Sequence, residues 1–236
     1  MGGGAVLLNK PRAPVEVYND LGDEVVNVFR VARDHGAELK RALQLTPYAE
    51  AELRAAHEKC PDRPVEQARR TIVRALQGFS TAAMYREENT TGFRRGHKAE
   101  GGGGEGGAQW RNYINTLDAV LERLQGVVIE QREATDVLLT HDAEDALHYV
   151  DPPYTHDTRE HTTAYPHEMS NEQHERLAEV LHTLKGAVVL SGYDNPLYAR
   201  LYKDWRRVCK DTVTYGGSAR VEVLWCSRRV QRGLVF

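Results

Sequence analysis

The sequence predicts a soluble globular protein with an α/β fold, and three observations support this prediction. Short apolar runs alternate with longer stretches in which apolar residues recur every three or four positions. The length of 236 residues and the hydrophobic content of 41% suit one globular domain, or one core with an insertion. No apolar run in the sequence approaches the roughly 18 residues that a membrane helix needs. We therefore expect a soluble protein of the cytoplasm.

Residues 1–78 are expected to form one strand and a series of helices. Val15–Asp20 alternates as a strand does and ends in the polar pair Asn19-Asp20. The next stretch places Val25 and Phe29 on one helical face and is expected to close at Gly36. Further helices are expected at Leu39–Leu45, Tyr48–Lys59 and Pro64–Gly78.

Apolar periodicity is absent between residues 79 and 109. Thr90–Lys98 is basic and polar, and Gly101–Gly107 consists of glycine apart from Glu105. This composition predicts a mobile loop, with a solvated surface insertion as the alternative. A helix is expected again from Trp110 to Gln125.

The second half of the chain alternates more regularly. Ser170 and Gln173 resemble a capping box that opens a helix through Leu184. Short helices are expected at Thr135–Thr140 and Leu197–Tyr202, and strands at Val127–Glu130, Leu147–Val150 (buried), Ala187–Leu190 (buried), Trp205–Cys209 and Val221–Cys226, the last two as paired edge strands. The basic residues Arg206, Arg207 and Lys210 would then lie on a solvated strand face.

Charge and cysteine content limit the function classes. The net charge of −3 and the pI near 6.4 give no overall basic field, so any affinity for nucleic acid must come from local patches. Cys60, Cys209 and Cys226 are odd in number, lie far apart and match no zinc spacing. Reduced thiols in a cytosolic protein are the simple interpretation.

The most informative motif is Asp151-Pro152-Pro153-Tyr154, which follows the predicted strand Leu147–Val150. The prolines cannot continue a ladder, so they force a rigid turn at the carboxyl end of the strand, where open α/β sheets bind ligands. A carboxylate, carbonyl groups and an aromatic ring would suit an exocyclic amine on a planar base. An ordinary strand-to-loop turn is the alternative interpretation of this motif taken by itself.

Three motifs in order carry a family resemblance. Gly2–Leu8, then Glu16–Asp20, then Asp151–Tyr154 follow the order seen in Dam-like DNA adenine-N6 methyltransferases. The chain also resembles phage-type members along Val25–Arg41, Thr90–Arg95 and Val188–Tyr198. The resemblance implies a Rossmann-like S-adenosylmethionine-dependent methyltransferase sheet with a helical and loop target-recognition insertion.

The resemblance implies that S-adenosylmethionine is the cofactor. Gly2, Gly3, Gly4 and Ala5 would form the turn beneath its amino-acid part, where side chains would collide. Asp20 would accept hydrogen bonds from the ribose hydroxyls, and capping of the following helix is its alternative role. Glu133 and Asp151 complete the implied cofactor set.

The same resemblance assigns catalysis to Asp151, Pro152 and Tyr154. The Asp151 carboxylate and the Pro152 carbonyl would accept the two amino hydrogens of adenine, while Tyr154 would stack on a base that has left the duplex. The acid favours adenine, since cytosine-N4 enzymes usually carry Ser-Pro-Pro-Tyr and protein-glutamine enzymes Asn-Pro-Pro-Tyr.

The implied partner is double-stranded DNA. Arg94, Arg95, Lys98 and Arg111 fall where the family carries its target-recognition segment, and they would contact guanine edges or phosphates. His97 lies in the same basic segment. A loop with Arg159 and the histidines His156, His161 and His167 follows the catalytic turn and would close over the base. No metal site is expected there, because the histidine spacing is irregular.

Two features depart from the family pattern. The family normally begins with a segment that ends in Gly-Gly-Lys or Gly-Ser-Lys, followed by a helix and a strand into Glu-Pro-Phe. These elements do not precede the glycines of this sequence. Without the central strand among them, we expect buried backbone groups to lack partners and this chain to self-associate. The second departure is Gln131–Ala134, where Asn-Arg-Asp-Ala is usual, so Glu133 is one methylene longer than the expected Asp.

The sequence thus predicts a site-specific DNA adenine-N6 methyltransferase of a bacterial or phage-infected cell, of the kind found in restriction-modification systems. Residues 1–36 would begin the methyltransferase domain, 37–125 would form the helical and target-recognition insertion, and 126–236 would complete the domain. A truncated, non-catalytic DNA-binding remnant and a methyltransferase acting on RNA or protein are the alternatives.

Overall fold

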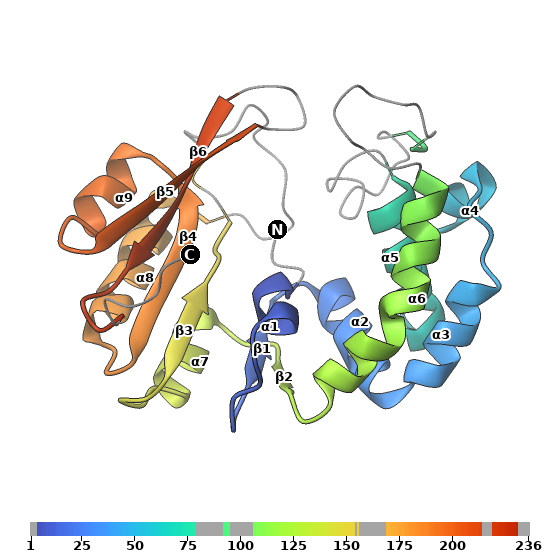
Figure 1. Cartoon of the computed structure of the whole chain (residues 1–236), viewed down its shortest axis with the longest axis horizontal. Helices are drawn as coiled ribbons and strands as arrows, with labels where there is room; N and C mark the ends of the chain where they lie inside the picture. The colour runs from blue at the N-terminus through green and yellow to red at the C-terminus, as the bar shows by residue number, and fades with distance from the viewer. Residues whose placement is uncertain are drawn as a thin grey trace. The chain divides into compact units, whose positions relative to one another are not determined.

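A computed structural model of the chain shows two compact units, unit 1 (residues 1–132) and unit 2 (residues 133–236) (Figure 1). The structure describes residues 4–78, 92–94, 106–153, 155, 169–213 and 219–230. Within these residues each unit has its own sheet and its own hydrophobic core. The domain boundaries predicted after residues 36 and 125 divide the chain by function rather than by contact, and they stay a prediction.

The sheet of unit 1 is a short parallel pair. β1 (Val17–Asn19) pairs with β2 (Val128–Glu130), and Tyr18 lies opposite Ile129. The backbone N–H of Asp20 continues this ladder by donating to the Glu130 carbonyl at 3.4 Å. Both strands were expected from the sequence, and both are confirmed at nearly the predicted bounds.

The helices of unit 1 lie between these strands in the sequence and form most of its core. They are α1 (Ala5–Asn9), α2 (Asp23–Asp34), α3 (Gly36–Gln44), α4 (Glu50–Ala55), α5 (Pro64–Gln77) and α6 (Gly106–Leu124). Leu39 and Leu43 of α3 are fully buried in one cluster with Trp110 and Leu117 of α6. Figure 1 shows α3, α5 and α6 running side by side.

One predicted boundary in unit 1 is confirmed in position but not in the role of its glycine. Gly36 was expected to close the helix that became α2. This helix ends at Asp34 with His35 as its C-cap, so Gly36 does follow the cap, but it is also the first residue of α3 and does not have a left-handed conformation. The turn between them is made by His35, whose N–H donates to the Val31 carbonyl at 2.7 Å. Pro64 begins α5 as expected, because the first helical position needs no N–H group.

Unit 2 contains a mixed sheet of four strands in the order β3-β4-β6-β5. β3 (Leu147–Val150) and β4 (Ala187–Tyr193) are parallel, whereas β6 (Ala219–Cys226) runs antiparallel to both β4 and β5 (Arg206–Val213). The expected pairing of the last two strands is confirmed. β6 is nevertheless an interior strand, with Trp225 fully buried, so only β5 of this pair is an edge strand.

β3 also differs from its prediction as a buried strand. It lies at the other edge of the sheet, and Leu147 is 58% exposed. Tyr149, on the same strand face, is also exposed, whereas His148 and Val150 are half-buried. The apolar run predicted a strand correctly but could not show how many of its faces other elements cover.

The helices of unit 2 are α7 (Ala134–Thr140), α8 (Asn171–Thr183) and α9 (Pro196–Leu201). The capping box predicted at α8 is confirmed, because Ser170 accepts from the Gln173 N–H and the Gln173 side chain accepts from the Ser170 N–H. Leu177 and Leu181 of α8 pack in one cluster with Leu190 of β4. α8 and α9 lie on one side of the sheet (Figure 1).

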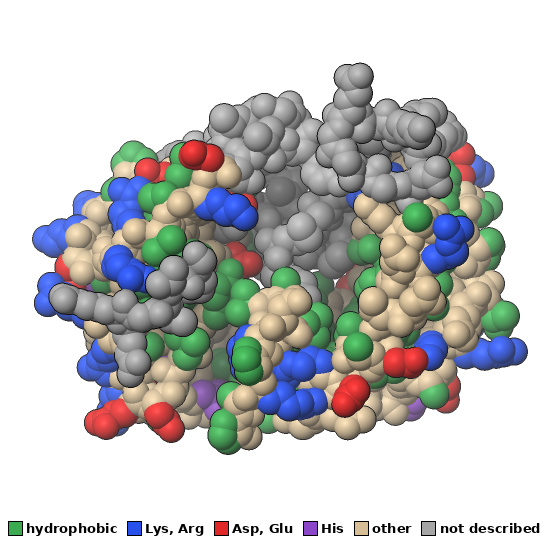
Figure 2. All heavy atoms as spheres, viewed as in Figure 1, with side chains coloured by type: hydrophobic (Ala, Val, Ile, Leu, Met, Phe, Trp, Pro, Cys, Tyr) green, Lys and Arg blue, Asp and Glu red, His purple; other side chains and the backbone are tan. Residues whose placement is uncertain are grey.

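The chain is therefore a mixed α/β protein, as predicted. The described strands form two separate sheets, and a single Rossmann-like sheet stays an expectation. No helix in the described part of the chain is long and apolar enough to cross a membrane. On the face shown in Figure 2, Lys and Arg side chains and Asp and Glu side chains are scattered over both units.

Candidate active site

The catalytic motif lies where the chain leaves β3. Val150 is the last residue of the strand and pairs with Leu190 of β4. Asp151 follows directly and is half-buried, and Pro152 is buried. Asp151 therefore stands at the carboxyl end of a strand, where the sequence placed it, because the two prolines end the ladder. Tyr154 lies outside the described residues.

The Asp151 side chain has a defined contact within unit 2. Ser191, the residue after Leu190 on β4, donates its hydroxyl proton to Oδ1 of Asp151 at 2.7 Å. Ser191 is buried, and the Tyr149 side chain lies beside it. Partial burial raises the pKa of the Tyr149 hydroxyl above its ordinary value, so this hydroxyl remains protonated at neutral pH. Ser191 was not predicted from the sequence as a site residue.

The glycine turn is partly described. Gly4 has φ 70° and ψ 15°, a left-handed conformation that favours glycine, and it precedes α1. A Cβ at Gly4 would lie 2.9 Å from Cζ of Phe29 and 3.7 Å from the ring of Tyr18. The collision that favours glycine here is thus with the protein's own Phe29 ring, and the Tyr18 ring is at ordinary contact distance. Ala5 begins α1 and is exposed, and Gly2 and Gly3 lie outside the described residues.

Asp20 follows β1 and is held by two donors. Its Oδ1 accepts from the Gly22 N–H at 2.8 Å, and its Oδ2 accepts from the Tyr18 hydroxyl at 3.2 Å. The N-cap residue of α2 is Gly22, so Asp20 orders the turn into the helix from two residues before the cap. Tyr18 contacts Asp20 and borders Gly4, which brings two of the predicted cofactor residues to the same ring.

The segment after β2 joins the carboxyl ends of the two strands of unit 1. Asn19 donates through Nδ2 to the Arg132 carbonyl at 3.0 Å and accepts from the Arg132 N–H, also at 3.0 Å. Gln131 donates to the Leu21 carbonyl and to Asp23. The Asn-Asp pair was noted in the sequence, but this role of Asn19 was not predicted.

Glu133 belongs to unit 2 and occupies the N-cap position of α7. Its side chain is exposed and makes no capping hydrogen bond. Gly4 and Asp20 therefore lie together in unit 1, whereas Asp151 and Glu133 lie in unit 2.

Two of the four predicted DNA-binding residues are described. Arg94 is anchored through its backbone, because its N–H donates to the Gln77 carbonyl at 2.8 Å and its carbonyl accepts from the Tyr48 hydroxyl at 2.6 Å. Its guanidinium donates to Gln109 of α6 at 3.0 Å. Arg111 is exposed on α6, two residues after Gln109, so it points to a different side of the helix. Arg95 and Lys98 lie outside the described residues.

The described residues contain no candidate metal site. Among the described residues, no group of three or more His, Cys, Asp or Glu side chains could hold a metal ion. His156, His161 and His167, for which a metal role was weighed, lie outside the described residues.

Comparison with known proteins identifies the class. The model of a family described as D12 class N6 adenine-specific DNA methyltransferase matches residues 1–215. Since the match covers most of the 236 residues, the chain belongs to this family. The resemblance inferred from the motifs is thereby confirmed. No curated protein matches the chain.

Proposed function

We propose that this chain transfers a methyl group from S-adenosylmethionine to the exocyclic amine of adenine at specific sites in double-stranded DNA. The observation that carries the proposal is the position of Asp151, an oriented carboxylate at the carboxyl end of β3, 2.7 Å from its donor Ser191. Open α/β sheets bind their ligands at this edge.

The proposed catalytic set is Asp151, Pro152 and Tyr154. The Asp151 carboxylate and the Pro152 carbonyl accept the two amino hydrogens, which turns the nitrogen lone pair out of conjugation with the ring. Holding the amine in this orientation supplies much of the rate acceleration. Tyr154 stacks on the base, which leaves the duplex to reach the site.

The residues of unit 1 fit the proposed cofactor. A carboxylate offers about four lone-pair positions, and the two described contacts of Asp20 fix its orientation towards further donors. Ribose hydroxyls are such donors. Following the family resemblance, we assign Gly2, Gly3, Gly4 and Ala5 to the amino-acid end of the cofactor. Glu133, which belongs to unit 2, keeps its predicted role at the adenine. When bound, S-adenosylmethionine supplies an activated methyl group.

A second candidate is a DNA-binding protein of this family that does not transfer methyl groups. The separation of the described strands into two sheets favours it, because β1 and β3 each pair with one strand only among the described residues. Such edges offer N–H and C=O groups to another chain, so this candidate includes self-association.

The test is incorporation of a labelled methyl group from S-adenosylmethionine into unmethylated, PCR-amplified DNA, followed by mass spectrometry of the nucleosides. We expect N6-methyldeoxyadenosine and no N4-methyldeoxycytidine. RNA and the protein itself serve as parallel acceptors. DNA binding without methyl transfer, in a self-associated species on size-exclusion chromatography, would favour the second candidate instead.

A further inference from the structure

The parallel register of β3 and β4 places two side chains together at one end of the sheet. Val150 pairs with Leu190, so the next residues along each strand, Asp151 and Ser191, face each other just beyond the last pair. Ser191 donates to Oδ1 of Asp151 at 2.7 Å, a length typical of a charge-assisted hydroxyl–carboxylate bond. The contact thus follows from the pairing of the strands.

The serine hydroxyl has one proton, and that proton goes to the carboxylate. A hydroxyl group can donate a single hydrogen bond, and Ser191 donates it to Oδ1 of Asp151. Tyr149 is a neighbour of this pair. Residues two apart on a strand point to the same face, so Tyr149 and Asp151 lie on one side of β3.

The backbone that carries Ser191 is packed on both sides. β4 lies between β3 and β6, and Ser191 is opposite Leu224 of β6. The next residue, Gly192, is closely covered, because a Cβ there would lie 3.0 Å from the ring of Tyr198 and 3.4 Å from that of Trp225. Both rings are buried. Ser191 therefore presents its hydroxyl from a position with little freedom to move.

An aspartate side chain needs such a restraint if it is to hold a ligand in one orientation. Its terminal torsion is broad, so an aspartate without a donor samples many carboxylate orientations. A donor on a rigid strand selects one of them. Catalytic groups have to be held within a small fraction of an ångström and a few degrees of the productive geometry.

We propose that Ser191 is a positioning residue that fixes the Asp151 carboxylate in the orientation that receives the amino group of the target base. This inference rests on the proposed function of Asp151. It adds that the pairing of two strands, in addition to the Asp-Pro-Pro-Tyr motif itself, sets the geometry of the acceptor.

The test compares Ser191→Ala with Ser191→Thr, which keeps the hydroxyl. For Ser191→Ala we expect kcat of methyl transfer to fall about tenfold, the equivalent of one hydrogen bond of about 1.4 kcal/mol. The KM values for S-adenosylmethionine and DNA should change less than twofold. Ser191→Thr should recover most of kcat.

Ser227→Ala is the matched control. Ser227 belongs to the same unit and hydrogen-bonds to the backbone N–H of Val188 at 3.0 Å, so its removal deletes a hydroxyl from the sheet without touching Asp151. We expect Ser227→Ala to keep the wild-type kcat. Equal losses of kcat in Ser191→Ala and Ser191→Thr, or a kcat within twofold of wild type in Ser191→Ala, would overturn the inference.

A second readout does not need activity. In a high-resolution crystal structure of Ser191→Ala we expect the Asp151 carboxylate to occupy more than one orientation, against one in the wild type. A single, unchanged orientation in the variant would refute the positioning role. If the wild type methylates no adenine, the proposed function fails, and the orientation of Asp151 still decides this inference.

Discussion

The two units of the chain are each stabilised internally by different interactions. Unit 1 contains buried charged side chains: that of Arg74 is 3% exposed and pairs with Glu24, and that of Glu16 is 4% exposed and pairs with Arg123. In unit 2 the arginine ion pairs among the described residues lie at the surface, such as Arg200 with Glu175. Its core is instead built from aromatic rings.

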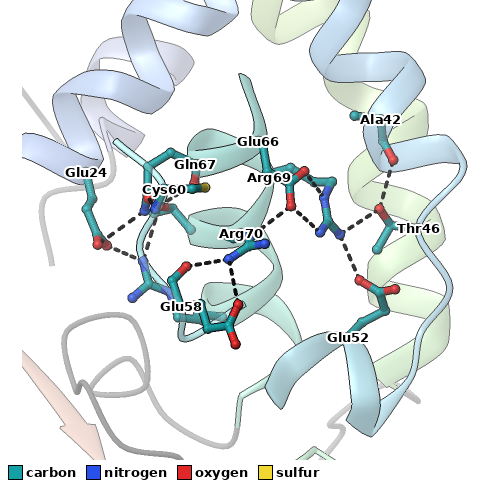
Figure 3. A network of polar contacts seen from close by, with 12 residues as sticks. Glu24, Ala42, Thr46, Glu52, Glu58, Cys60, Glu66, Gln67, Arg69 and Arg70 are labelled. Carbon is teal, nitrogen blue, oxygen red and sulfur yellow. Dashed lines mark hydrogen bonds and ion pairs between the residues drawn. The ribbon is translucent and has the colours of Figure 1, made fainter. Parts of the chain in front are cut away.

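Figure 3 shows how far the charges of unit 1 extend around α5. Arg69 donates to Glu66 through two nitrogens, at 2.8 Å each, and to Glu52 at 2.9 Å. Arg70 reaches the same Glu66 at 2.8 Å and the Glu58 carbonyl at 2.6 Å. The two arginines thus share one carboxylate within α5 and connect this helix to α4 and to the segment that follows α4.

The core of unit 2 packs ring against ring. Tyr198 meets Trp225 edge to face at 5.0 Å between ring centroids, and Tyr202 lies 4.9 Å from Trp205. Offset and edge-to-face ring pairs of this kind stabilise a core beyond the area that they bury. The comparison teaches that the core of unit 2 is mainly aromatic and apolar, whereas the helices of unit 1 depend on the charge state of a few carboxylates.

The largest expected effect separates chemistry from cofactor binding. Asp151→Asn should lower kcat about a hundredfold or more, because one oriented acceptor in the reacting complex is removed. Asp20→Asn should act mainly on KM for S-adenosylmethionine, raising it about tenfold through the loss of charge-assisted bonds. Steady-state kinetics of both variants measure the split. Equal effects of the two variants on kcat would contradict this division between the units.

The next effect concerns the buried ion pair of unit 1. Glu24→Gln leaves the Arg74 guanidinium buried without its carboxylate, which should cost about 3 kcal/mol of unfolding free energy. Urea unfolding at neutral pH measures this loss. The control is Glu58→Gln. The Glu58 side chain is exposed, so its ion pair with Arg70 should contribute less than about 1 kcal/mol of unfolding free energy. The double variant Glu24→Gln/Arg74→Met should recover much of the loss, and its failure to do so would reject a charge-based explanation.

DNA affinity should depend on the basic segment of unit 1. Replacing Arg94, Arg95 and Lys98 by Gln should weaken binding and reduce the slope of log K against log salt by up to about 3, at roughly 0.9 for each phosphate that the protein no longer neutralises. Fluorescence anisotropy over a range of salt concentrations gives the slope. The matched control removes the same charge from β5 of unit 2, at Arg206, Arg207 and Lys210, which are exposed. An identical slope in the two triple variants would support a solvated loop at residues 90–98.

The smallest expected effect is a pH dependence that differs between the units. Hydrogen bonds from arginine hold the pKa of Glu16 and of Glu66 at about 2, below the ordinary value of 4.5. Because the folded pKa is depressed, this stabilisation is fully present above pH 4.5 and is lost as the pH falls towards 2. Hydrogen exchange at pH 6 and pH 3.5, corrected for intrinsic rates, should show α5 losing protection more than β4.

The variant Glu66→Gln should reduce the pH dependence of α5 and leave that of β4 unchanged. Glu175→Gln, at an exposed pair of unit 2, is the control and should behave as the wild type does. Parallel loss of protection in α5 and β4 of the wild type would show that the two units respond to acid as one.

Local signals predicted much of this fold. Pro64 at the start of α5 and the Ser170–Gln173 capping box are settled by a few adjacent residues, and both were predicted correctly. The order of strands depends on long-range pairing, which periodicity does not encode. For that reason β3 was taken for a buried strand and β6 for an edge strand.

The residues of the candidate site show the same contrast between local signals and long-range pairing. Asp151 and Asp20 were found from motifs, because each follows an apolar strand directly. Ser191 was passed over, because its partner is distant in the sequence and the two meet only through the register of β3 and β4. That register was accessible in principle, since each of the two predicted strands is followed directly by a polar residue.

The pairing of Asp151 with Ser191 by strand register has a consequence for engineering. The two residues are held by adjacent strands, so the length of chain between residues 155 and 169 does not set their separation. That stretch can be shortened, lengthened or exchanged for one from another member of the family while the carboxylate keeps its donor. A one-residue insertion inside β4, by contrast, would turn Ser191 to the opposite face of the sheet. Chimeras that exchange this stretch are therefore best built with junctions near residues 155 and 169 and with β3 and β4 left intact.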